Sequence, residues 1–503
     1  MTQSGPRPSA PSLSTQVEFD ILASPAAGGA AIRGGALRVG GYLVGVLLTV
    51  VSAAVLFRYL GPDDAGKYVT VLAIVAIVGS MFDGGLHSLA IRETSVRRGD
   101  DRSAVIGDLL GMRLVLGVVG IVLAVAFAIA AGYEQSLVLG TALGSVGLVL
   151  WSVHLIIAAP LVASLRLGWV TTIDVSRQAA TVVLVLAFVW AGLGLLAFFT
   201  VPIPIAVAAV VWTIFLVYGK VALAPSFRTS RWRPLLRDVV PYALATAAGL
   251  LYFRVAVVLM SLISTERETG LYSAAFRIVE VLMIVPQLAV GVLLPILARA
   301  ASDDHDRLAY GVDRAFRATA VFGAGLAVVL AIGAPFAIAV VAGPDFADAA
   351  DMLRVQAFGL GVALVTSVFT YALLSLRLHR ELLLANGIAL AVSVALTLVL
   401  GRSWGGMGAA TAVVAAELCL AAGAVWLLVR NSPALSPVWS FLPRVLAAGL
   451  VTAAVAAIPG VPNVVLAATG LVVYVALALA LHLVPEEVLV ELRRARQPRS
   501  ARS

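Results

Sequence analysis

Charged residues are scarce in this sequence: Asp, Glu, Lys and Arg make up 12% of its 503 residues, whereas hydrophobic residues make up 61%. A soluble protein of this length could not bury so much apolar surface, so the composition indicates an integral membrane protein. The net charge of +8 does not predict a nucleic-acid partner, because the 35 Lys and Arg residues are spread along the chain.

Cysteine and histidine are also rare. The single cysteine, Cys419, excludes disulfides, zinc clusters and iron–sulfur ligation, and the five histidines show no metal-ligand spacing. No cofactor is therefore expected. The first residues lack a basic segment followed by an apolar one, so we interpret residues 1–37 as a disordered cytoplasmic tail and not as a signal peptide.

Long apolar runs are abundant instead. A helix needs about 20 apolar residues to cross a hydrocarbon core roughly 30 Å thick, and fourteen stretches of the chain meet this requirement. We therefore predict an all-α integral membrane protein with about 14 transmembrane helices. The predicted spans are 38–58, 69–91, 106–131, 137–164, 169–192, 196–218, 239–263, 270–298, 316–342, 353–376, 382–400, 406–428, 442–459 and 463–483.

The distribution of basic residues predicts the orientation. An even number of spans places both termini on one side, and the loops of that side are rich in arginine, as at Arg97, Arg231 and the basic tail 484–503. The opposite turns carry acidic residues, as at Asp63 and Asp345. Because basic loops stay inside, we expect a multi-pass protein of the cytoplasmic membrane with both termini in the cytoplasm.

An internal repeat divides the chain. Gly66-Lys67-Tyr68 opens the second span and Gly270-Leu271-Tyr272 opens the eighth, each after a short turn with acidic residues. We predict two six-helix lobes in parallel repeat, 38–218 and 239–428, with two further helices in 442–483. Such repeats are typical of transporters with a central cavity. Alternatively, Gly and Tyr are simply common at interfacial turns.

Five segments carry a resemblance to a known family. They are Arg58–Tyr68, Phe82–Glu93, Gly270–Arg277, Gly343–Arg354 and Gly405–Ala410. In order, they resemble segments of bacterial polysaccharide-biosynthesis flippases, in the multidrug/oligosaccharidyl-lipid/polysaccharide exporter superfamily. The resemblance implies that the protein moves a polyprenyl-diphosphate-linked oligosaccharide from the inner to the outer leaflet by alternating access, for cell-surface polysaccharide export. Glycosyltransferases or a polymerase of the same pathway are possible partners, besides membrane lipids, and the sugar is not identified.

Charges inside the predicted spans are candidate sites, because a charge at membrane depth is costly. Arg254 and Arg277 each lie about nine residues from the turn that joins their spans, which is roughly 13 Å at about 1.5 Å per residue. Arginine suits a diphosphate because its planar fork donates two parallel hydrogen bonds. We predict that Arg254, Arg277 and Glu280 form the substrate site. The alternative is a structural pair of Arg277 with Glu280, with Arg254 reaching the surface.

Three other carboxylates are candidates for coupling to Na⁺ or H⁺. Asp83 precedes two glycines that can loosen a helix, Asp174 lies three residues before Arg177, and Glu417 stands in an otherwise apolar span. The structural alternatives for Asp83 are capping of a helix break or pairing with Arg92 or a neighbouring helix. For Asp174 the alternative is an ion pair with Arg177, and for Glu417 it is a polar neighbour.

Four other functions compete with a polysaccharide flippase. An enzyme needs catalytic groups at an aqueous face, and the short outer turns argue against one. A cation-coupled multidrug antiporter would favour carboxylates and aromatic residues in its cavity, whereas Arg254 and Arg277 favour an anionic substrate. A lipid II flippase and a non-transporting scaffold for envelope assembly stay open.

Overall fold

The computed structural model describes residues 27–83, 85–219, 221–283, 297, 299–300 and 305–483. Within these ranges the chain is helical, with turns, short 3-10 helices and no strand. Most of the predicted N-terminal tail and the whole predicted tail 484–503 lie outside the described residues. The first helix already begins at Ala27, ahead of the first predicted span.

The helices of the first half follow one another with short turns. The longest bends at Gly61, a glycine with a φ of 69°, followed by Pro62, so one continuous helical segment holds two predicted spans. The helices are α1 (Ala27–Asp83), α2 (Leu86–Val96), α3 (Gly99–Ala130), α4 (Gln135–Ala163), α5 (Leu167–Trp190), α6 (Leu195–Phe198) and α7 (Pro202–Val217).

The second half repeats this pattern, again with one long helix that bends at a glycine. Gly405 has a φ of 56°, and the carboxylate of Glu268 accepts a hydrogen bond of 2.7 Å from the backbone N–H of Gly406 just beyond the bend. The helices are α8 (Thr229–Ile263), α9 (Glu266–Leu282), α11 (His305–Val341), α12 (Ala349–Ser375), α13 (His379–Asn431), α14 (Leu442–Ala453) and α15 (Asn463–Ala480). Three short 3-10 helices, η3 (Pro344–Phe346), η4 (Pro433–Leu435) and η5 (Ala454–Ala457), lie in the connections.

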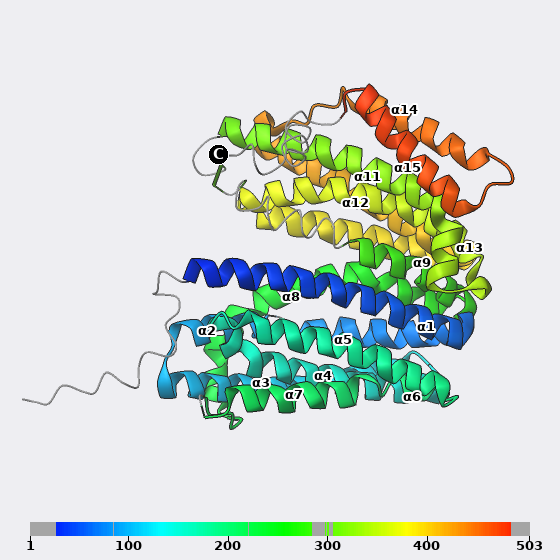
Figure 1. Cartoon of the computed structure of the whole chain (residues 1–503). Coiled ribbons are helices and arrows are strands. Elements are labelled where there is room, and N and C mark those ends of the chain that lie inside the picture. The colour runs from blue at the N-terminus through cyan, green and yellow to red at the C-terminus, as the bar shows by residue number, and fades with distance from the viewer. Residues whose placement is uncertain are drawn as a thin grey trace, which may run out of the picture.

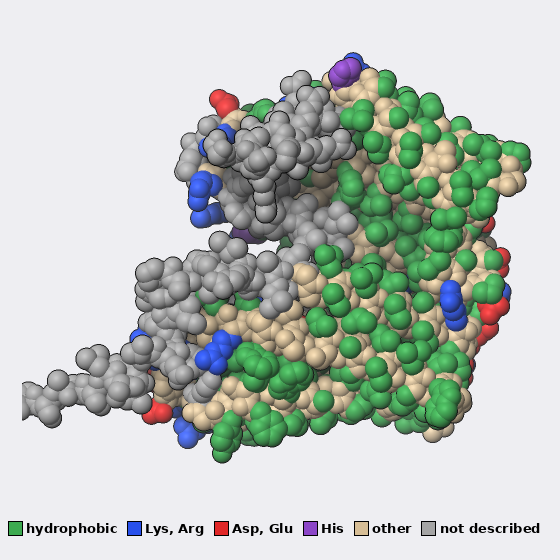
Figure 2. Space-filling model, in the orientation of Figure 1, with side chains coloured by type: hydrophobic (Ala, Val, Ile, Leu, Met, Phe, Trp, Pro, Cys, Tyr) green, Lys and Arg blue, Asp and Glu red, His purple; other side chains and the backbone are tan. Residues whose placement is uncertain are grey.

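Among the described residues, nine helices are long and apolar enough to cross a membrane. Two of them, Gly40–Val96 and His379–Asn431, each hold two predicted spans, and Ala248–Ile263 and Leu442–Ala457 are shorter apolar helices. The all-helical membrane fold is thus confirmed, and the count of fourteen spans stays a prediction. Hydrophobic side chains cover the flank of the helices seen in Figure 2, as a lipid-facing surface requires.

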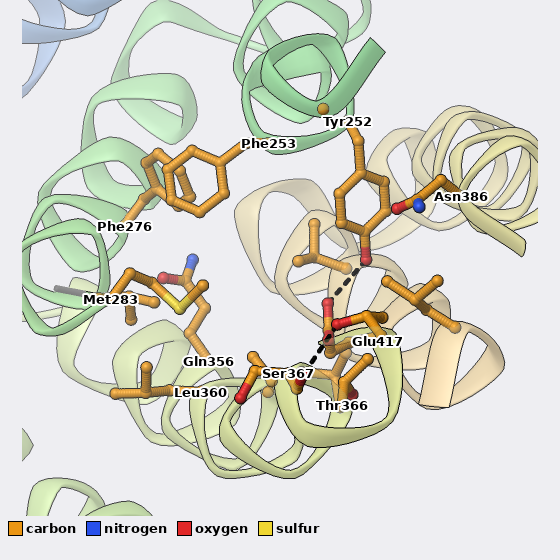
Figure 3. Close-up of a pocket in the computed structure, with 18 of the residues that line it drawn as sticks. Tyr252, Phe253, Phe276, Met283, Gln356, Leu360, Thr366, Ser367, Asn386 and Glu417 are labelled. Carbon is orange, nitrogen blue, oxygen red and sulfur yellow. Dashed lines mark hydrogen bonds between the residues drawn. The ribbon is translucent and has the colours of Figure 1, made fainter. Parts of the chain in front are cut away.

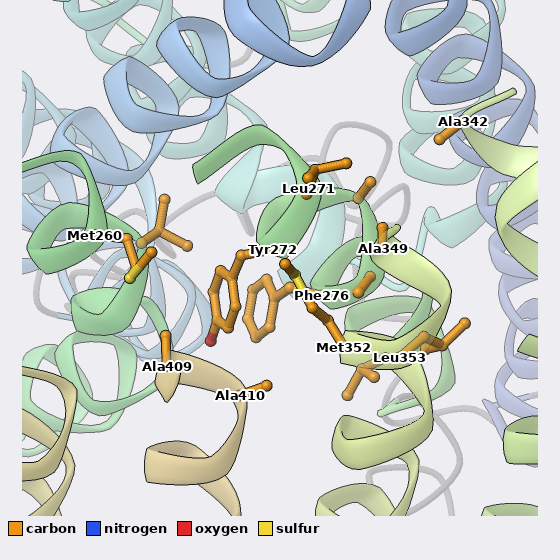
Figure 4. Packing of buried hydrophobic residues seen from close by; sticks show 14 of the residues in the cluster. Met260, Leu271, Tyr272, Phe276, Ala342, Ala349, Met352, Leu353, Ala409 and Ala410 are labelled. Atoms are coloured by element: carbon orange, nitrogen blue, oxygen red, sulfur yellow. The ribbon is translucent and has the colours of Figure 1, made fainter. Parts of the chain in front are cut away.

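The helices lie side by side in two groups (Figure 1). Helices α2–α7 form the lower group and α11–α15 the upper one, while α1, α8 and α9 lie between them and pack against one another. The core of this middle layer is made by small residues around aromatic ones (Figure 4): Tyr272 and Phe276 of α9 pack near Met260, Met352 and Ala409. The small residues let the helices approach closely.

At one end of the bundle the two groups of helices are tied together. The Lys67 ammonium lies 2.8 Å from a carboxylate oxygen of Glu134 and 3.3 Å from one of Glu266. Arg58 Nη2 donates hydrogen bonds of 2.9 and 2.8 Å to the carbonyl oxygens of Ala339 and Val340, at the end of α11. These contacts join α1 to α9 and to α11, and we call this the closed end.

Candidate functional site

The two arginines of the predicted substrate site meet at one carboxylate. Arg254 of α8 donates a hydrogen bond to Oε1 of Glu280, and Arg277 of α9 donates one to Oε2 of the same residue. Their side chains are 18% and 31% exposed, and that of Glu280 is 19% exposed. The pair of Arg277 with Glu280 is therefore present, but Arg254 joins it and does not reach the surface alone.

The local sequence explains this convergence. Helices α8 and α9 are antiparallel neighbours, joined by the short turn Ser264-Thr265. The side chain of Thr265 caps α9 by accepting a hydrogen bond of 3.2 Å from the backbone N–H of Glu268. Because the turn is short and α9 starts at once, residues at similar distances from the turn lie at similar depth, as the sequence predicts for Arg254 and Arg277.

Two contiguous cavities, of about 530 and 560 Å³, lie at this cluster: Arg277 and Glu280 line both, and Arg254 lines the first. Helices α1, α4, α5 and α9 line both cavities. Helices α7 and α8 line only the cavity of about 530 Å³. We call the two together the central cavity. The residues that line both parts are Thr49, Trp151, Arg177, Gln178, Arg277 and Glu280.

Two further arginines make the central cavity cationic. Arg38 of α1 and Arg177 of α5 line it, so that four arginines, with Arg254 and Arg277, face two carboxylates, those of Asp174 and Glu280. Four positive and two negative charges leave an excess of two positive charges. Such a cavity selects for an anion.

Arg177 stacks on an aromatic ring, and Asp174 attracts it electrostatically without a direct ion pair among the described residues. The Arg177 guanidinium lies 4.5 Å from the centre of the Trp151 ring. The Nε atoms of Arg177 and Arg254 are buried and have no hydrogen-bond partner in the described part of the chain. Both guanidinium groups therefore keep donors for a ligand.

The sequence interpretation missed Arg38 and Arg177 as site residues. Arg38 stands at the edge of the first predicted span, where an arginine usually marks a membrane boundary. The spacing of three residues predicts an ion pair of Arg177 with Asp174 and so gives Arg177 a structural role. The sequence signal for Arg177 is an arginine inside a predicted span, like Arg254 and Arg277. Its contact with Trp151 joins α5 to α4 and cannot be predicted from spacing.

The three coupling-ion candidates lie in different places. The side chain of Asp83 lies outside the described residues. The helix does end at Asp83, and Gly85, with a φ of 96°, separates α1 from α2, as expected for a helix loosened by glycines. The buried Arg113 donates a hydrogen bond of 3.0 Å to the carbonyl oxygen of Phe82 at this break.

Asp174 lines the central cavity.

Glu417 lies in a separate cavity inside the second lobe. This cavity has a volume of about 340 Å³ and lies between α8, α9, α12 and α13 (Figure 3). The hydroxyl of Tyr252 donates a hydrogen bond of 2.9 Å to Oε2 of Glu417, and Thr366 is a second hydrogen-bonding neighbour. The predicted polar neighbour of Glu417 is thus present, and its role in coupling stays a prediction.

Comparison with known families shows where the chain belongs. The family model described as polysaccharide biosynthesis protein matches residues 55–351, which is more than half of the chain. The chain belongs to this polysaccharide biosynthesis family. The resemblance seen in the sequence is thereby confirmed. Among curated protein sequences there is no match.

Solved structures share the fold of this polysaccharide biosynthesis protein. The lipid II flippase MurJ in an inward closed conformation has a TM-score of 0.70 and 14% identity, covering 88% of this chain and 98% of the flippase. An inward-facing multidrug resistance transporter of the MATE family has a TM-score of 0.63 and 15% identity, with 79% and 98% covered. A MOP superfamily transporter from Pyrococcus furiosus has a TM-score of 0.57 and 14% identity, with 80% and 96% covered.

This member of the polysaccharide biosynthesis family is therefore a multi-pass membrane protein with the fold that these MOP superfamily transporters share. At these identities the solved structures inform the fold alone. Evidence on the substrate comes from the side chains of the central cavity.

Proposed function

We propose that this protein moves a polyprenyl-diphosphate-linked saccharide from the inner to the outer leaflet of the cytoplasmic membrane by alternating access. The observation that carries the proposal is the excess of two positive charges in the central cavity, from four arginines against two carboxylates. Arginine keeps its charge at all physiological pH values and binds phosphate oxygens through a planar fork, so these residues suit a diphosphate.

Glu280 acts in this proposal as an internal anion. It neutralises part of the charge of Arg254 and Arg277 while no substrate is bound, which lowers the cost of holding two guanidinium groups at membrane depth. A diphosphate that enters the central cavity competes with Glu280 for the same donors. The exchange lets the arginines bind and release the substrate without ever being left unpaired.

The distribution of charge supports an inward-facing orientation. Acidic side chains gather near the closed end, on the right of Figure 2, and include the exposed Asp63, Glu134, Glu266 and Asp345. Basic residues occupy the turns of the opposite end, as at Arg97 and Arg231. Since basic loops stay in the cytoplasm, we propose that the closed end faces outward and that the central cavity is loaded from the inner leaflet.

The coupling ion belongs to this proposal as well. Asp174 is the candidate that lines the central cavity together with the arginines. A cation bound at its carboxylate would therefore interact electrostatically with an anionic substrate in the same cavity. Glu417 lies apart, in the cavity of the second lobe. Exchange of Na⁺ or H⁺ at Asp174 is therefore the coupling step that the geometry favours.

Flipping of a fluorescent polyprenyl-diphosphate saccharide in proteoliposomes tests the proposal. The wild type, Arg254→Gln and Arg277→Gln are compared, with Arg444→Gln as the control because Arg444 is exposed on α14 and lines none of the three cavities. We expect activity in the wild type and in the control, and loss of most of it in the other two variants. Proton- or sodium-driven efflux of cationic dyes without any lipid flipping would instead identify an antiporter.

A further inference from the structure

The cavity of the second lobe lies directly behind the central cavity. The ring of Phe276 lines both, and Phe253 packs against it with ring centroids 4.8 Å apart. On α8, Arg254 lines the central cavity while Tyr252, two residues earlier, lines the other one. Helices α8 and α9 therefore form a shared wall, with cationic side chains on one side and neutral ones on the other.

Gln356 is a buried polar side chain of this cavity whose amide is unsatisfied. It is 4% exposed, and among the residues that the structure describes neither its Oε1 nor its Nε2 has a hydrogen-bond partner. Figure 3 shows it on the side of the cavity near Met283 and Phe276, across from Glu417. A buried amide without partners is costly, so the site calls for a ligand or water that both donates and accepts hydrogen bonds.

This requirement separates two kinds of ligand. A metal cation accepts electron pairs only, so it would satisfy Oε1 of Gln356 and leave Nε2 without an acceptor. Glu417, the acidic group of the cavity, already accepts a hydrogen bond from Tyr252. A hydroxyl group donates and accepts at once, and a sugar offers several in fixed positions.

The rest of the lining fits a sugar as well. The hydroxyl groups of Ser367 and Thr370 donate to backbone carbonyl oxygens and keep lone pairs as acceptors. The amide of Asn386 donates one N–H to the carbonyl oxygen of Leu382 and keeps a second N–H and its Oδ1, and the hydroxyl of Tyr371 can donate and accept. Phe253 and Phe276 supply apolar faces, and the volume of about 340 Å³ falls within the range of about 300–1,000 Å³ found for small-molecule sites. In small-molecule sites of this size, a few polar groups in a mostly apolar cavity fix the orientation of the ligand.

We propose that the cavity between α8, α9, α12 and α13 is a subsite for a neutral sugar unit of the transported lipid, with Gln356 as its central hydrogen-bonding residue. The inference rests on the proposed function, because the diphosphate on Arg254 and Arg277 brings the saccharide to the shared wall. It assigns the two cavities different tasks: the central one binds the charge, and the second one distinguishes a glycosylated lipid from a bare one.

Binding of two lipids to the purified full-length protein tests this assignment. The probes are undecaprenyl diphosphate and undecaprenyl diphosphate that carries one hexose, each titrated against the wild type, Gln356→Met and Arg254→Gln. Ser393→Ala is the matched control, since the Ser393 hydroxyl is also buried without a hydrogen-bond partner in the described part of the chain but lines none of the three cavities. We expect the wild type to bind the hexosyl lipid about tenfold more tightly than the bare lipid.

Gln356→Met should remove most of that difference and leave the affinity for the bare lipid unchanged, whereas Arg254→Gln should weaken both lipids alike. Equal affinity of the wild type for the two lipids would overturn the sugar subsite and leave the proposed function standing. Failure of the wild type to bind either lipid would overturn both. A preference for the hexosyl lipid that survives in Gln356→Met would also overturn the subsite, since the amide would then contribute nothing to recognition of the sugar.

Discussion

Gly66 and Gly270 face each other across the closed end of the bundle. A Cβ built on Gly66 would lie 3.0 Å from the backbone nitrogen of Gly270, and one built on Gly270 would lie 3.1 Å from that of Gly66. These are the first residues of the two repeated motifs found in the sequence. The repeat therefore brings equivalent positions of α1 and α9 into backbone contact, where any residue larger than glycine would meet a carbonyl group.

Gly270→Ala is expected to open the closed end. The added methyl group would collide with the carbonyl oxygen of Pro62, which is backbone and cannot rotate away. In a Cys419→Ser background, spin labels at Asp64→Cys and Asp348→Cys should move apart by several ångströms, and the protein should favour the outward-open state. Gly387→Ala is the control, because a Cβ there meets nothing within 4 Å. An unchanged label distance in Gly270→Ala would show that the added methyl group does not prevent the closed end from closing.

Much of the fold could be predicted from the sequence, for a physical reason. Apolar runs in a membrane protein can only be helices, so the spans follow from length and composition. The bends at Gly61 and Gly405 were predicted only as turns between spans, since continuous hydrogen bonding past a positive-φ glycine depends on packing, such as the contact of Glu268 with Gly406.

The candidate site could be predicted in part. Arg254, Arg277 and Glu280 lie on two helices joined by a short turn, so their depth follows from counting residues. Arg38 and Arg177 come from helices far apart in sequence, and only tertiary packing brings them to the same cavity. No pattern in the sequence points to Gln356. It becomes a candidate only because the folded protein buries its amide without hydrogen-bond partners among the described residues.

Lys67→Gln is expected to weaken the closed end slightly. The Lys67 side chain is 18% exposed, but Glu134 and Glu266 are 48% and 49% exposed, so water screens the contacts. The pair with Glu134 should contribute less than about 1 kcal/mol. The same pair of spin labels should report a modest rise in the open population. A rise as large as that in Gly270→Ala would mean that charge, and not backbone packing, holds this end closed.

Acid should weaken the same contact. The hydrogen bond from Lys67 holds the pKa of Glu134 below its ordinary value of 4.5. A carboxylate with a lowered pKa stabilises the closed end fully above its ordinary value, and this contribution is lost as the pH falls through the lowered one. Label distances followed from about pH 7 to about pH 3 should lengthen only at the acid end. In Glu134→Gln the acid-dependent change should shrink; an identical profile would assign it to other carboxylates.

Arg177→Lys is expected to slow lipid flipping by about tenfold while the protein stays folded. Lysine keeps the charge but loses the planar fork that binds phosphate and stacks on Trp151. Flipping in proteoliposomes and thermal stability in detergent are the measurements. Arg430→Lys is the matched control, because Arg430 stacks on Trp426 at 5.2 Å but lines none of the three cavities. An equal loss of flipping activity in Arg177→Lys and Arg430→Lys would mean that losing any arginine–tryptophan stack slows the protein, without a specific role for Arg177.

Glu280→Gln is expected to raise the affinity for undecaprenyl diphosphate by about tenfold and to slow its transport. The substitution keeps the shape of the side chain but removes the negative charge that competes for Arg254 and Arg277. Tighter binding then hinders release on the far side, so the dissociation rate should fall together with the flipping rate. Asp313→Asn is the control, since Asp313 pairs with Arg317 at 2.8 Å on α11 and lines none of the three cavities. Weaker binding in Glu280→Gln would mean that the carboxylate positions the two guanidinium groups for the diphosphate and does not compete with it, because loss of a competitor can only strengthen binding.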